Sequence, residues 1–508
     1  MYPVHELLRR SSADSPHKEA VVCGTTRLPF SAVSEAATSI ASFLTSRGIG
    51  RGERVGIFTT KSVEEIFAIY GVLGSGAAFV HLNPQYRDTH LRHVITDCGI
   101  KTLFVDSARA RMLGSAFDGE SPLDLVISLS GGAPPDPTVA TDVTQLRDIL
   151  RSPRRLGDRP AEVQEDDVAS IIYTSGSTGM PKGILVTHEI FYDSTVASAE
   201  VLNNTREDRI ISITPFSFDG ALSQLFTAMY VGGTLVQQRS NFAKDIVDTL
   251  LDEKITGCHA VPSLWGILLQ ERSPFPRHSY PYLRYVSIIG EVLPARHLAR
   301  LREILGATDF YLMYGTTEAF RSTYLPPPDL DRKPGSVGIP FPGVSVAVLD
   351  DNGDPCPAGE IGMIVHRGAF VSPGYWKDPE RTGRTFVDGS VHTGDRGWLD
   401  DEGYLYYAGR CDSMIKVQGF RLSPEEVEVC IHDMESVAEV AVIGVPAKEI
   451  GTIVKALIVL HPSAQTSDKD VINHCRTQLP HYMIPSVVEF LPALPKTSGN
   501  KLNRAALV

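Results

Sequence analysis

Short, mostly apolar runs alternate with stretches of helical periodicity in the first third of the chain. Residues 55–58, 78–82 and 102–105 have the length and composition of buried strands, and residues 63–73 and 91–98 repeat apolar positions at helical spacing. Strands that alternate with helices are typical of a parallel sheet with helices on its faces. The pattern therefore predicts an α/β fold for this part of the chain.

Later stretches of the chain extend this pattern. Residues 168–172, 255–262 and 283–289 are predicted strands. The segment 131–167 is rich in proline, aspartate and arginine, which favours a surface connection. Two turn-rich stretches predict a β-rich part of the fold, residues 334–343 and 359–365.

The C-terminal part of the chain has a helix-start signature followed by strand patterns. Ser423 suits a helix N-cap, Pro424 suits the first helical position, and Glu426 is placed as the capping-box partner of Ser423. Apolar residues at 437–442 and 454–460 predict two strands. We therefore expect a small α+β domain at this end.

Length, charge and cysteine usage restrict the class of protein. A chain of 508 residues is too long for one ordinary hydrophobic core, so two or more domains are expected. A formal net charge of −12 argues against a general binder of nucleic acid or anionic membranes. The seven cysteines form no Cys-x-x-Cys pair, which favours free thiols over a zinc site or a disulfide framework. Without a signal-peptide core or a membrane-length apolar run, the sequence predicts a soluble cytoplasmic protein.

A loop at residues 173–184, Tyr-Thr-Ser-Gly-Ser-Thr-Gly-Met-Pro-Lys-Gly-Ile, carries the main chemical signal. Its glycines let the backbone approach a ligand, and its hydroxyls together with Lys182 supply donors that suit a polyphosphate. It is not a Walker A loop, because Pro181 precedes the lysine and Gly183 follows it. A flexible Ser/Gly linker is the alternative, but linkers seldom lie between two apolar runs.

This loop closely resembles the phosphate loop of the AMP-forming adenylating superfamily, which includes acyl-CoA synthetases, luciferases and the adenylation domains of nonribosomal peptide synthesis. Three later stretches match the family in its order: residues 310–318 with Tyr-Gly-Thr-Thr-Glu, residues 391–398, and residues 409–422. The resemblance covers roughly residues 20–504. It implies a large layered α/β domain with a β-rich part (residues 1–409) and a small mobile α+β domain (residues 410–508).

The resemblance also implies which residues bind ATP and Mg²⁺. Tyr314 would offer a flat face to adenine, Thr317 a hydroxyl to the α-phosphate, and Glu318 a hard oxygen ligand to Mg²⁺. Asp395 and Arg410 would bond the ribose. The residues expected at ATP are Thr174, Ser175, Gly176, Ser177, Thr178, Gly179, Lys182, Gly290, Glu291, Tyr314, Gly315, Thr316, Asp395, Tyr407 and Arg410.

Three residues after position 410 have counterparts in the family's moving small domain. Lys501 aligns with the catalytic lysine, although the reversed order Gly499-Asn500 leaves Lys496 as a competing choice. Asp412 matches the hinge, and Gly419 lies where the family passes the thiol arm of the acceptor. Rotation about the hinge would present the lysine and the glycine to the site in turn.

Asp219 is the main clue to the acid substrate. It follows an aromatic residue and precedes a helix-like period, so it is either a helix N-cap or, as in amino-acid-activating members of the family, the partner of a substrate ammonium group. Ala221 departs from the serine that those members usually have. Arg321 would pair with a second carboxylate if it points inward, and is otherwise a surface or structural arginine. The residues expected at the acid are Asp219, Ser223, His259, Ser287, Ile289, Met313 and Arg321, with no proton-transfer role for His259.

The resemblance implies an AMP-forming ligase that joins a carboxylic acid to a thiol. Asp219, Ser287 and Arg321 resemble freestanding enzymes that load β-amino acids, particularly of the 3-methylaspartate kind, onto carrier proteins. The acceptor would be a separate phosphopantetheinyl carrier protein, or coenzyme A. A coenzyme A ligase for another carboxylic acid is the runner-up, and a non-catalytic binder that keeps the fold is third.

Overall fold

The computed structural model describes most of the chain. None of the described helices is long and apolar enough to cross a membrane, and the six described cysteines are free thiols. The described residues are 2–117, 121–129, 140–152, 162–174, 180–270, 272–290, 293, 295–410, 415–422, 424–447, 451–461, 464–495 and 507.

A seven-stranded sheet contains the strands predicted near the start of the chain. Its order is β7-β6-β5-β3-β4-β8-β9, and only the last pair is antiparallel. The α/β prediction is confirmed here. The elements are β3 (Arg54–Phe58), α3 (Val63–Ser75), β4 (Ala78–His81), α4 (Asp88–Cys98), β5 (Thr102–Val105), α5 (Ser107–Phe117), β6 (Leu125–Ser128), β7 (Asp142–Gln145), α6 (Leu146–Arg151), β8 (Val168–Thr174) and β9 (Lys182–Thr187).

The segment 131–167 is more than a surface connection, so that prediction is wrong in part. It contributes β7 to the edge of the sheet, and buried Leu146 and Ile149 anchor α6 in the core. Two apolar residues three positions apart form too short a pattern to stand out in a sequence rich in proline and charge.

A second sheet carries fourteen of the described strands. Thirteen follow the order β17-β18-β20-β21-β16-β15-β14-β13-β12-β10-β11-β1-β2, and β19 pairs with β20. Neighbours from β11 to β14 are parallel, whereas pairing beyond β14 is antiparallel and forms the predicted β-rich part. The strands are β1 (Glu19–Cys23), β2 (Thr26–Pro29), β10 (Arg209–Ser212), β11 (Thr234–Gln237), β12 (Gly257–Ala260), β13 (Tyr285–Ile288), β14 (Asp309–Tyr314), β15 (Thr323–Leu325), β16 (Ser336–Pro340), β17 (Val344–Leu349), β18 (Gly362–Gly368), β19 (Phe386–Val387), β20 (Ser390–Leu399) and β21 (Leu405–Arg410).

Buried aromatic side chains join the two sheets through helices between them. Phe191 lies 4.8 Å from Phe226 and stacks on Phe79 of β4, ring centroid to ring centroid 6.1 Å. Such rings bury a large apolar area, so their packing fixes the position of one sheet relative to the other. The helices around the second sheet are α1 (Glu6–Asp14), α2 (Phe30–Ser46), α7 (His188–Val201), α8 (Asp219–Val231), α9 (Ala243–Asp252), α10 (Pro262–Leu268), α11 (Ala295–Leu305) and α12 (Pro379–Thr385).

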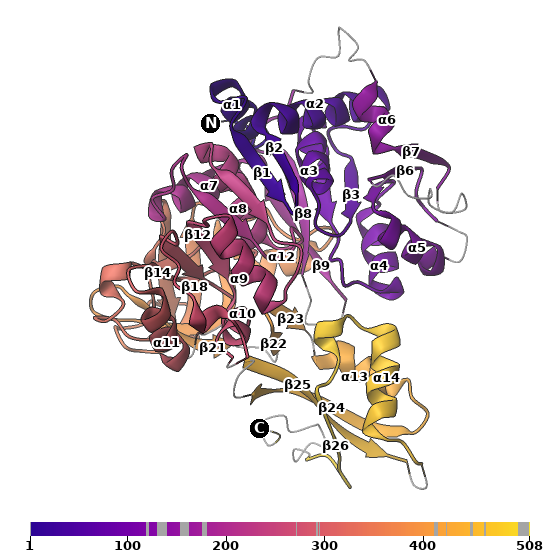
Figure 1. The fold of residues 1–508 in the computed structure, drawn as a ribbon. Helices are drawn as coiled ribbons and strands as arrows, with labels where there is room; N and C mark the ends of the chain where they lie inside the picture. Colours follow the sequence, from indigo (N-terminus) through magenta and orange to yellow (C-terminus); the bar gives the residue numbers. More distant parts are fainter. Residues whose placement is uncertain are drawn as a thin grey trace.

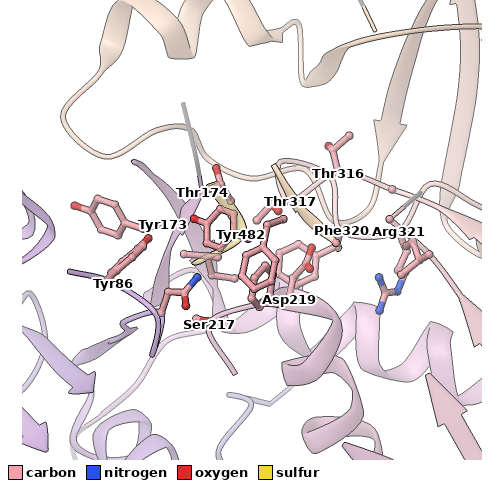
Figure 2. A pocket seen from close by; sticks show the side chains of 18 residues that line it. Tyr86, Tyr173, Thr174, Ser217, Asp219, Thr316, Thr317, Phe320, Arg321 and Tyr482 are labelled. Atoms are coloured by element: carbon pink, nitrogen blue, oxygen red, sulfur yellow. The ribbon is translucent and has the colours of Figure 1, made fainter. Parts of the chain in front are cut away.

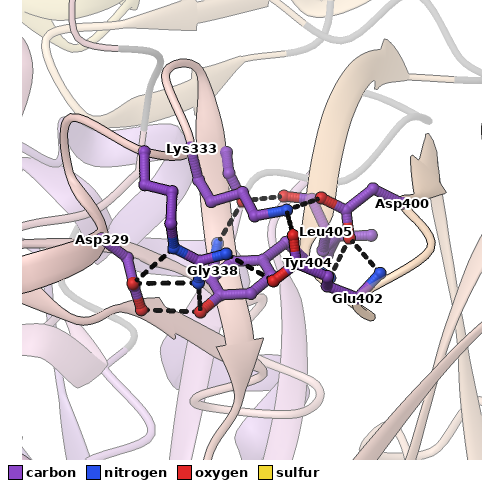
Figure 3. Close-up of polar contacts among 9 residues, drawn as sticks. Asp329, Lys333, Gly338, Asp400, Glu402, Tyr404 and Leu405 are labelled. Atoms are coloured by element: carbon purple, nitrogen blue, oxygen red, sulfur yellow. Dashed lines mark hydrogen bonds and ion pairs between the residues drawn. The ribbon is translucent and has the colours of Figure 1, made fainter.

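Ion pairs secure the turn between β20 and β21 (Figure 3). Lys333 Nζ lies 2.7 Å from a carboxylate oxygen of Asp400 and 2.6 Å from one of Glu402. The same ammonium group lies 4.8 Å from the ring centroid of Tyr404. Because the turn joins the two strands directly, these contacts stabilise the hairpin that carries Asp395.

A small α+β domain follows the large one and lies below it in Figure 1, coloured orange to yellow. Its main sheet has the order β24-β25-β26, and two helices pack on it. The predicted small domain is confirmed, while its boundary at residue 410 stays a prediction. The elements are β22 (Ile415–Val417), β23 (Phe420–Leu422), α13 (Pro424–His432), β24 (Val437–Ala447), β25 (Gly451–Leu460), α14 (Asp468–Gln478) and β26 (Val487–Phe490).

Candidate active site

A cleft opens where the carboxyl ends of β8 and β14 meet the start of α8 and the small domain (Figure 2). Its volume is about 110 Å³. Open α/β sheets bind ligands beyond the carboxyl ends of their strands, which makes this the expected place for a site. The sequence-predicted residues that line it are Thr174, Asp219, Ile289, Gly290, Gly315, Thr316, Thr317, Arg321 and Gly419.

Lys182 and Glu318 form an ion pair beside Thr317. The Nζ atom of Lys182 donates a 2.9 Å hydrogen bond to Oε1 of buried Glu318. Tyr375 donates to the same oxygen at 2.8 Å, and burial together with the charge of Glu318 raises the pKa of this phenol, which keeps it protonated. Sequence reasoning gave no role to Tyr375. The signal available in the sequence was the glycine before it, and in the structure Gly374 has a φ of 145°, which few other residues adopt.

One member of this ion pair, the carboxylate of Glu318, is an oxygen donor that suits magnesium. Glu318 is a single buried carboxylate, and no three His, Cys, Asp or Glu side chains gather as a metal cluster anywhere in the described ranges. Mg²⁺ in nucleotide enzymes takes one or two carboxylates, and water and phosphate oxygens complete its coordination. Glu318 therefore fits an ion that arrives with ATP.

Helix α4 supports the chain on both sides of residues 175–179. At the end of β8, Tyr173 donates a hydrogen bond to Asp97. Just before β9, the carbonyl oxygen of Pro181 lies 2.9 Å from Nε2 of His93. Two parts of the predicted phosphate loop, one on each side of positions 175–179, thus rest on one helix.

A larger cavity, about 330 Å³, lies beside Tyr314 and between the two domains. Gly290, Gly315 and Tyr407 line it, and the rings of Tyr314 and Tyr407 are 5.9 Å apart. The Tyr314 hydroxyl donates to the fully buried carboxylate of Asp395 at 2.8 Å. Aromatic faces beside glycine backbone suit a purine, so the structure gathers these predicted nucleotide residues around one space.

Several predicted nucleotide and catalytic positions lie outside the described residues. They are 175–179, Glu291, Asp412, Lys496 and Lys501, as well as the side chain of Arg410. Among the residues that are described, the hydroxyl of Thr316 is buried and has no hydrogen-bond partner. A buried hydroxyl without a partner is costly, so this oxygen suits a ligand contact.

Asp219 is the first residue of α8 and does not cap it. Phe218 takes the N-cap position, while Oδ1 of Asp219 accepts the backbone N–H of Gly220 at 2.7 Å. The N-cap interpretation is therefore wrong. The carboxylate lines the cleft, and its role toward an ammonium group stays a prediction.

Arg321 is buried in the cleft wall and is not a surface residue. Its exposed fraction is 4%, and it lines the cleft together with Asp219. Burial lowers the pKa of the guanidinium, and the charge of Asp219 opposes that shift. Arginine keeps its proton in proteins, so a desolvated positive charge lies within the electrostatic reach of a carboxylate.

His259 and Ser287 form a neutral polar pair on neighbouring strands. Nδ1 of His259 lies 2.9 Å from Oγ of Ser287. Burial, and to a smaller extent the charge of Arg321, lowers the pKa of His259 to about 3, so the imidazole is neutral near pH 7. Gly220 makes room for it, because a Cβ there would lie 2.9 Å from Nε2.

These residues surround a small second cavity behind the cleft. Its volume of about 20 Å³ holds little more than one water molecule. Arg321 lines both spaces and therefore marks the point where the cleft ends. The predicted acid-binding residues around the small cavity are Ser223, His259, Ser287, Met313 and Arg321.

The turn between β22 and β23 brings the small domain to the cleft. Gly419 has a φ of 83°, and a Cβ at this position would lie 2.9 Å from Cγ1 of Val261. Glycine is thus required by conformation and by space. Lys416, which sequence reasoning missed, lies 5.3 Å from the ring centroid of Tyr407; its position in a short Ile-Lys-Val strand predicted nothing beyond an exposed side chain.

Two family matches cover most of the chain. Residues 8–376 match the AMP-binding enzyme family, and residues 426–501 match the AMP-binding enzyme C-terminal domain. The chain belongs to the AMP-binding enzyme family. It is an AMP-forming ligase, as the sequence predicted.

Similar proteins include ligases for several acids. The chain is 29% identical to the long-chain-fatty-acid–CoA ligase FadD13 of Mycobacterium tuberculosis, over 99% of this chain and 97% of that protein. It is 28% identical to the fatty acid–[acyl-carrier-protein] ligase ScoC of Streptomyces coeruleorubidus, over 97% and 93%. It is also 27% identical to part of a linear gramicidin synthase polypeptide of Brevibacillus parabrevis, over 99% of this chain but only 10% of that protein.

Two structures of o-succinylbenzoate CoA synthetase from Bacillus subtilis differ in their likeness to this chain. A double mutant bound to a CoA product analogue superposes with a TM-score of 0.84, at 25% identity, covering 99% of this chain and 98% of that one. The complex with ATP and magnesium has a TM-score of 0.70 at the same identity and coverage. The overall arrangement of this chain is therefore more similar to that of the product-analogue complex.

Proposed function

We propose that the enzyme activates a small acidic amino acid, such as a β-amino acid of the 3-methylaspartate type, as its aminoacyl-AMP. The proposal rests mainly on one observation: Asp219 and buried Arg321 line the same cleft as Thr317. A carboxylate suits the ammonium group, and a guanidinium suits the second carboxylate of such a substrate. A plain alkyl chain would leave both charges desolvated without a ligand partner.

The dimensions and polarity of the pocket support a short substrate. Within the described part of the chain, the space beyond Arg321 is the cavity of about 20 Å³, and the pair His259–Ser287 forms part of its wall. A long acyl chain would need to displace these side chains and expose its methylene groups to polar atoms. The pocket therefore favours a compact, polar acid over a fatty acid.

Activation requires positioning and charge neutralisation. A carboxylate oxygen of the amino acid forms a bond to the α-phosphorus of ATP, and the bond to pyrophosphate breaks. The carboxylate is already ionised at pH 7, so no general base is needed. Neutral His259 agrees with this, because it serves as a hydrogen-bonding wall. Holding the two anions together supplies most of the rate.

The charged groups beside the cleft are suited to this task. Glu318 would hold Mg²⁺, which neutralises charge on the triphosphate when bound. Lys182 lies next to it, so the pair can rearrange as phosphate oxygens arrive. Thr316 and Thr317 offer hydroxyls to the α-phosphate, and Lys501 would add an ammonium group from the small domain.

The acyl group then passes to a thiol. Gly419 borders the cleft from the small domain, and the absence of a side chain there lets the turn pack directly against Val261 at the edge of the cleft. We assign the thiol to the phosphopantetheine arm of a separate carrier protein. The similarity to the carrier-protein ligase ScoC supports this choice.

The test is ATP–pyrophosphate exchange with a panel of acids. The panel contains aspartate, 3-methylaspartate, alanine, β-alanine, benzoate and octanoate. Exchange is expected with the acidic amino acids, at rates at least tenfold above those with the other acids. Exchange with octanoate or benzoate alone would refute the assignment.

Coenzyme A is the second candidate acceptor. The favouring observation is the greater likeness to the structure bound to a CoA product analogue. Thioester formation with coenzyme A, compared with a phosphopantetheinylated carrier protein at equal concentration, separates the two acceptors.

A further inference from the structure

The small domain contacts the large one through a buried polar pair remote in sequence. Nε2 of His90, on α4, lies 2.5 Å from Oε1 of Glu426, on α13. The two side chains are 2% and 8% exposed. An interdomain pair so well shielded from water is sensitive to loss of either partner, because the remaining polar group would stay buried and unpaired.

Aromatic rings continue this contact toward the cleft. The ring of Tyr86 stacks on the imidazole of His90, with centroids 5.4 Å apart. From the small domain, Phe420 stacks on Tyr482 at 4.0 Å and meets Phe218 of the large domain edge to face at 4.9 Å. Tyr86, Phe218, Phe420 and Tyr482 all line the cleft. The position of α13 on α4 is thus linked to the position of the Gly419 turn at the cleft.

We propose that His90 and Glu426 form an interdomain latch that holds the small domain in the arrangement for thiol transfer. They would act as positioning residues for the second half-reaction. In the observed arrangement the Gly419 turn lies at the cleft, and the chain is more similar to a product-analogue complex than to an ATP complex of one related enzyme. Since the partners belong to different domains, a rotation that brings Lys501 to ATP separates them.

This inference rests on the proposed transfer to a thiol and makes a prediction for each half-reaction. A contact that is made in only one of two domain arrangements shifts the equilibrium toward that arrangement, by an amount set by the free energy of the contact. Loss of the latch therefore slows thiol transfer, which needs the observed arrangement. The rate of acid activation stays unchanged or rises.

The experiment compares two rates in His90→Gln, Glu426→Gln and the double variant. Acid activation is measured by ATP–pyrophosphate exchange with the preferred acid of the panel. Thiol transfer is measured as thioester formation with pantetheine, the arm that coenzyme A and carrier proteins share. The matched control is His432→Gln, because His432 lies on α13 but is exposed.

The ratio of thiol transfer to exchange is expected to fall about tenfold in each single variant and to stay within twofold in the control. The double variant should be no worse than a single one, since the two side chains act as a pair. Equal ratios in all variants, or a loss of exchange as large as the loss of transfer, would overturn the latch.

Hydrogen–deuterium exchange of the unliganded protein provides a readout that needs no substrate. Amides of residues 415–422 and 425–431 should exchange at least fivefold faster in His90→Gln and Glu426→Gln than in the wild type and the His432→Gln control. Unchanged amide exchange would also overturn the latch. If no acid of the panel supports pyrophosphate exchange, the proposed substrate fails, and the amide rates still decide the latch.

Discussion

Lys182 and Glu318, 136 residues apart in the chain, share a hydrogen bond of 2.9 Å from Nζ to Oε1. The lysine belongs to β9 of the first sheet, and the glutamate follows β14 of the second. Their contact therefore joins the two sheets at the cleft. The positive group that we predict to bind phosphate and the negative group that we predict to bind the metal are kept together as a pair of zero net charge, which lowers the cost of burying each of them.

Substitution of Glu318 by glutamine should abolish most of the acid activation. Glutamine retains the size and one oxygen but is a poor ligand for Mg²⁺. We expect pyrophosphate exchange to fall by about 10²–10³, the range found when one electrostatic stabiliser is removed from an active site. The measurement is exchange as a function of magnesium concentration, with Glu360→Gln, an exposed site, as control. A loss of less than threefold would contradict the role of Glu318.

Substitution of Arg321 by methionine tests recognition of the second carboxylate. Methionine fills similar space without charge, so kcat/KM for the acidic amino acid should fall about 100-fold, equivalent to roughly 2–3 kcal/mol for a lost charged hydrogen bond. Alanine as substrate should be affected much less. Equal losses with the two substrates would mean that Arg321 supports only the structure of the pocket.

Substitution of Asp219 by asparagine tests recognition of the ammonium group. The amide preserves the shape at the start of α8 but removes the negative charge near Arg321. Exchange with aspartate should drop at least tenfold, while exchange with succinate, which lacks the amino group, should hold or rise. If succinate exchange falls in parallel, the ammonium assignment is wrong.

The buried imidazole of His259 should make stability depend on pH. Its pKa in the folded protein is lowered to about 3, so below pH 6.5 the unfolded chain binds a proton that the folded chain does not. Stability is therefore complete above about pH 6.5 and falls as the pH drops toward 3. At pH 5 the free energy of unfolding should be lower than at pH 7 by about 2 kcal/mol through His259 alone.

Urea unfolding of wild type and His259→Gln at pH 7 and pH 5 measures that contribution. The variant should lose about 2 kcal/mol less between the two pH values. Part of the dependence should remain, because burial also lowers the pKa of His188 to about 3. The exposed control His432→Gln should behave as the wild type does. An identical pH dependence in His259→Gln would show that this imidazole is protonated in the folded state.

Much of the fold follows from local sequence patterns. The strand at 102–105 has the predicted bounds, and the helix predicted at 63–73 ends two residues later, at Ser75. These elements are strongly apolar and periodic. By contrast, β7 and α6 went unrecognised because their burial depends on neighbours far along the chain, such as those that cover Ile149.

The place of the candidate site could be predicted where several short motifs match one family in order, as with Lys182, Tyr314 and Glu318, although their roles stay predictions. The sequence does not show which distant residue each of these side chains contacts. Glu426 has the sequence position of a capping-box residue, yet it meets His90 from another domain. Tyr375 likewise reaches Glu318 only in the folded protein, where its hydroxyl donates a hydrogen bond to the carboxylate. The spacing of residues along the chain does not predict such long-range contacts.

Helix α4 supports three separate parts of the protein. His90 meets the small domain, whereas Asp97 and His93 hold the residues before and after positions 175–179. A shift of this single helix would therefore displace both the predicted phosphate loop and the small domain. We therefore expect substitutions on the surface of this helix, at a distance from every reacting atom, to change the rate of acid activation relative to the rate of thiol transfer.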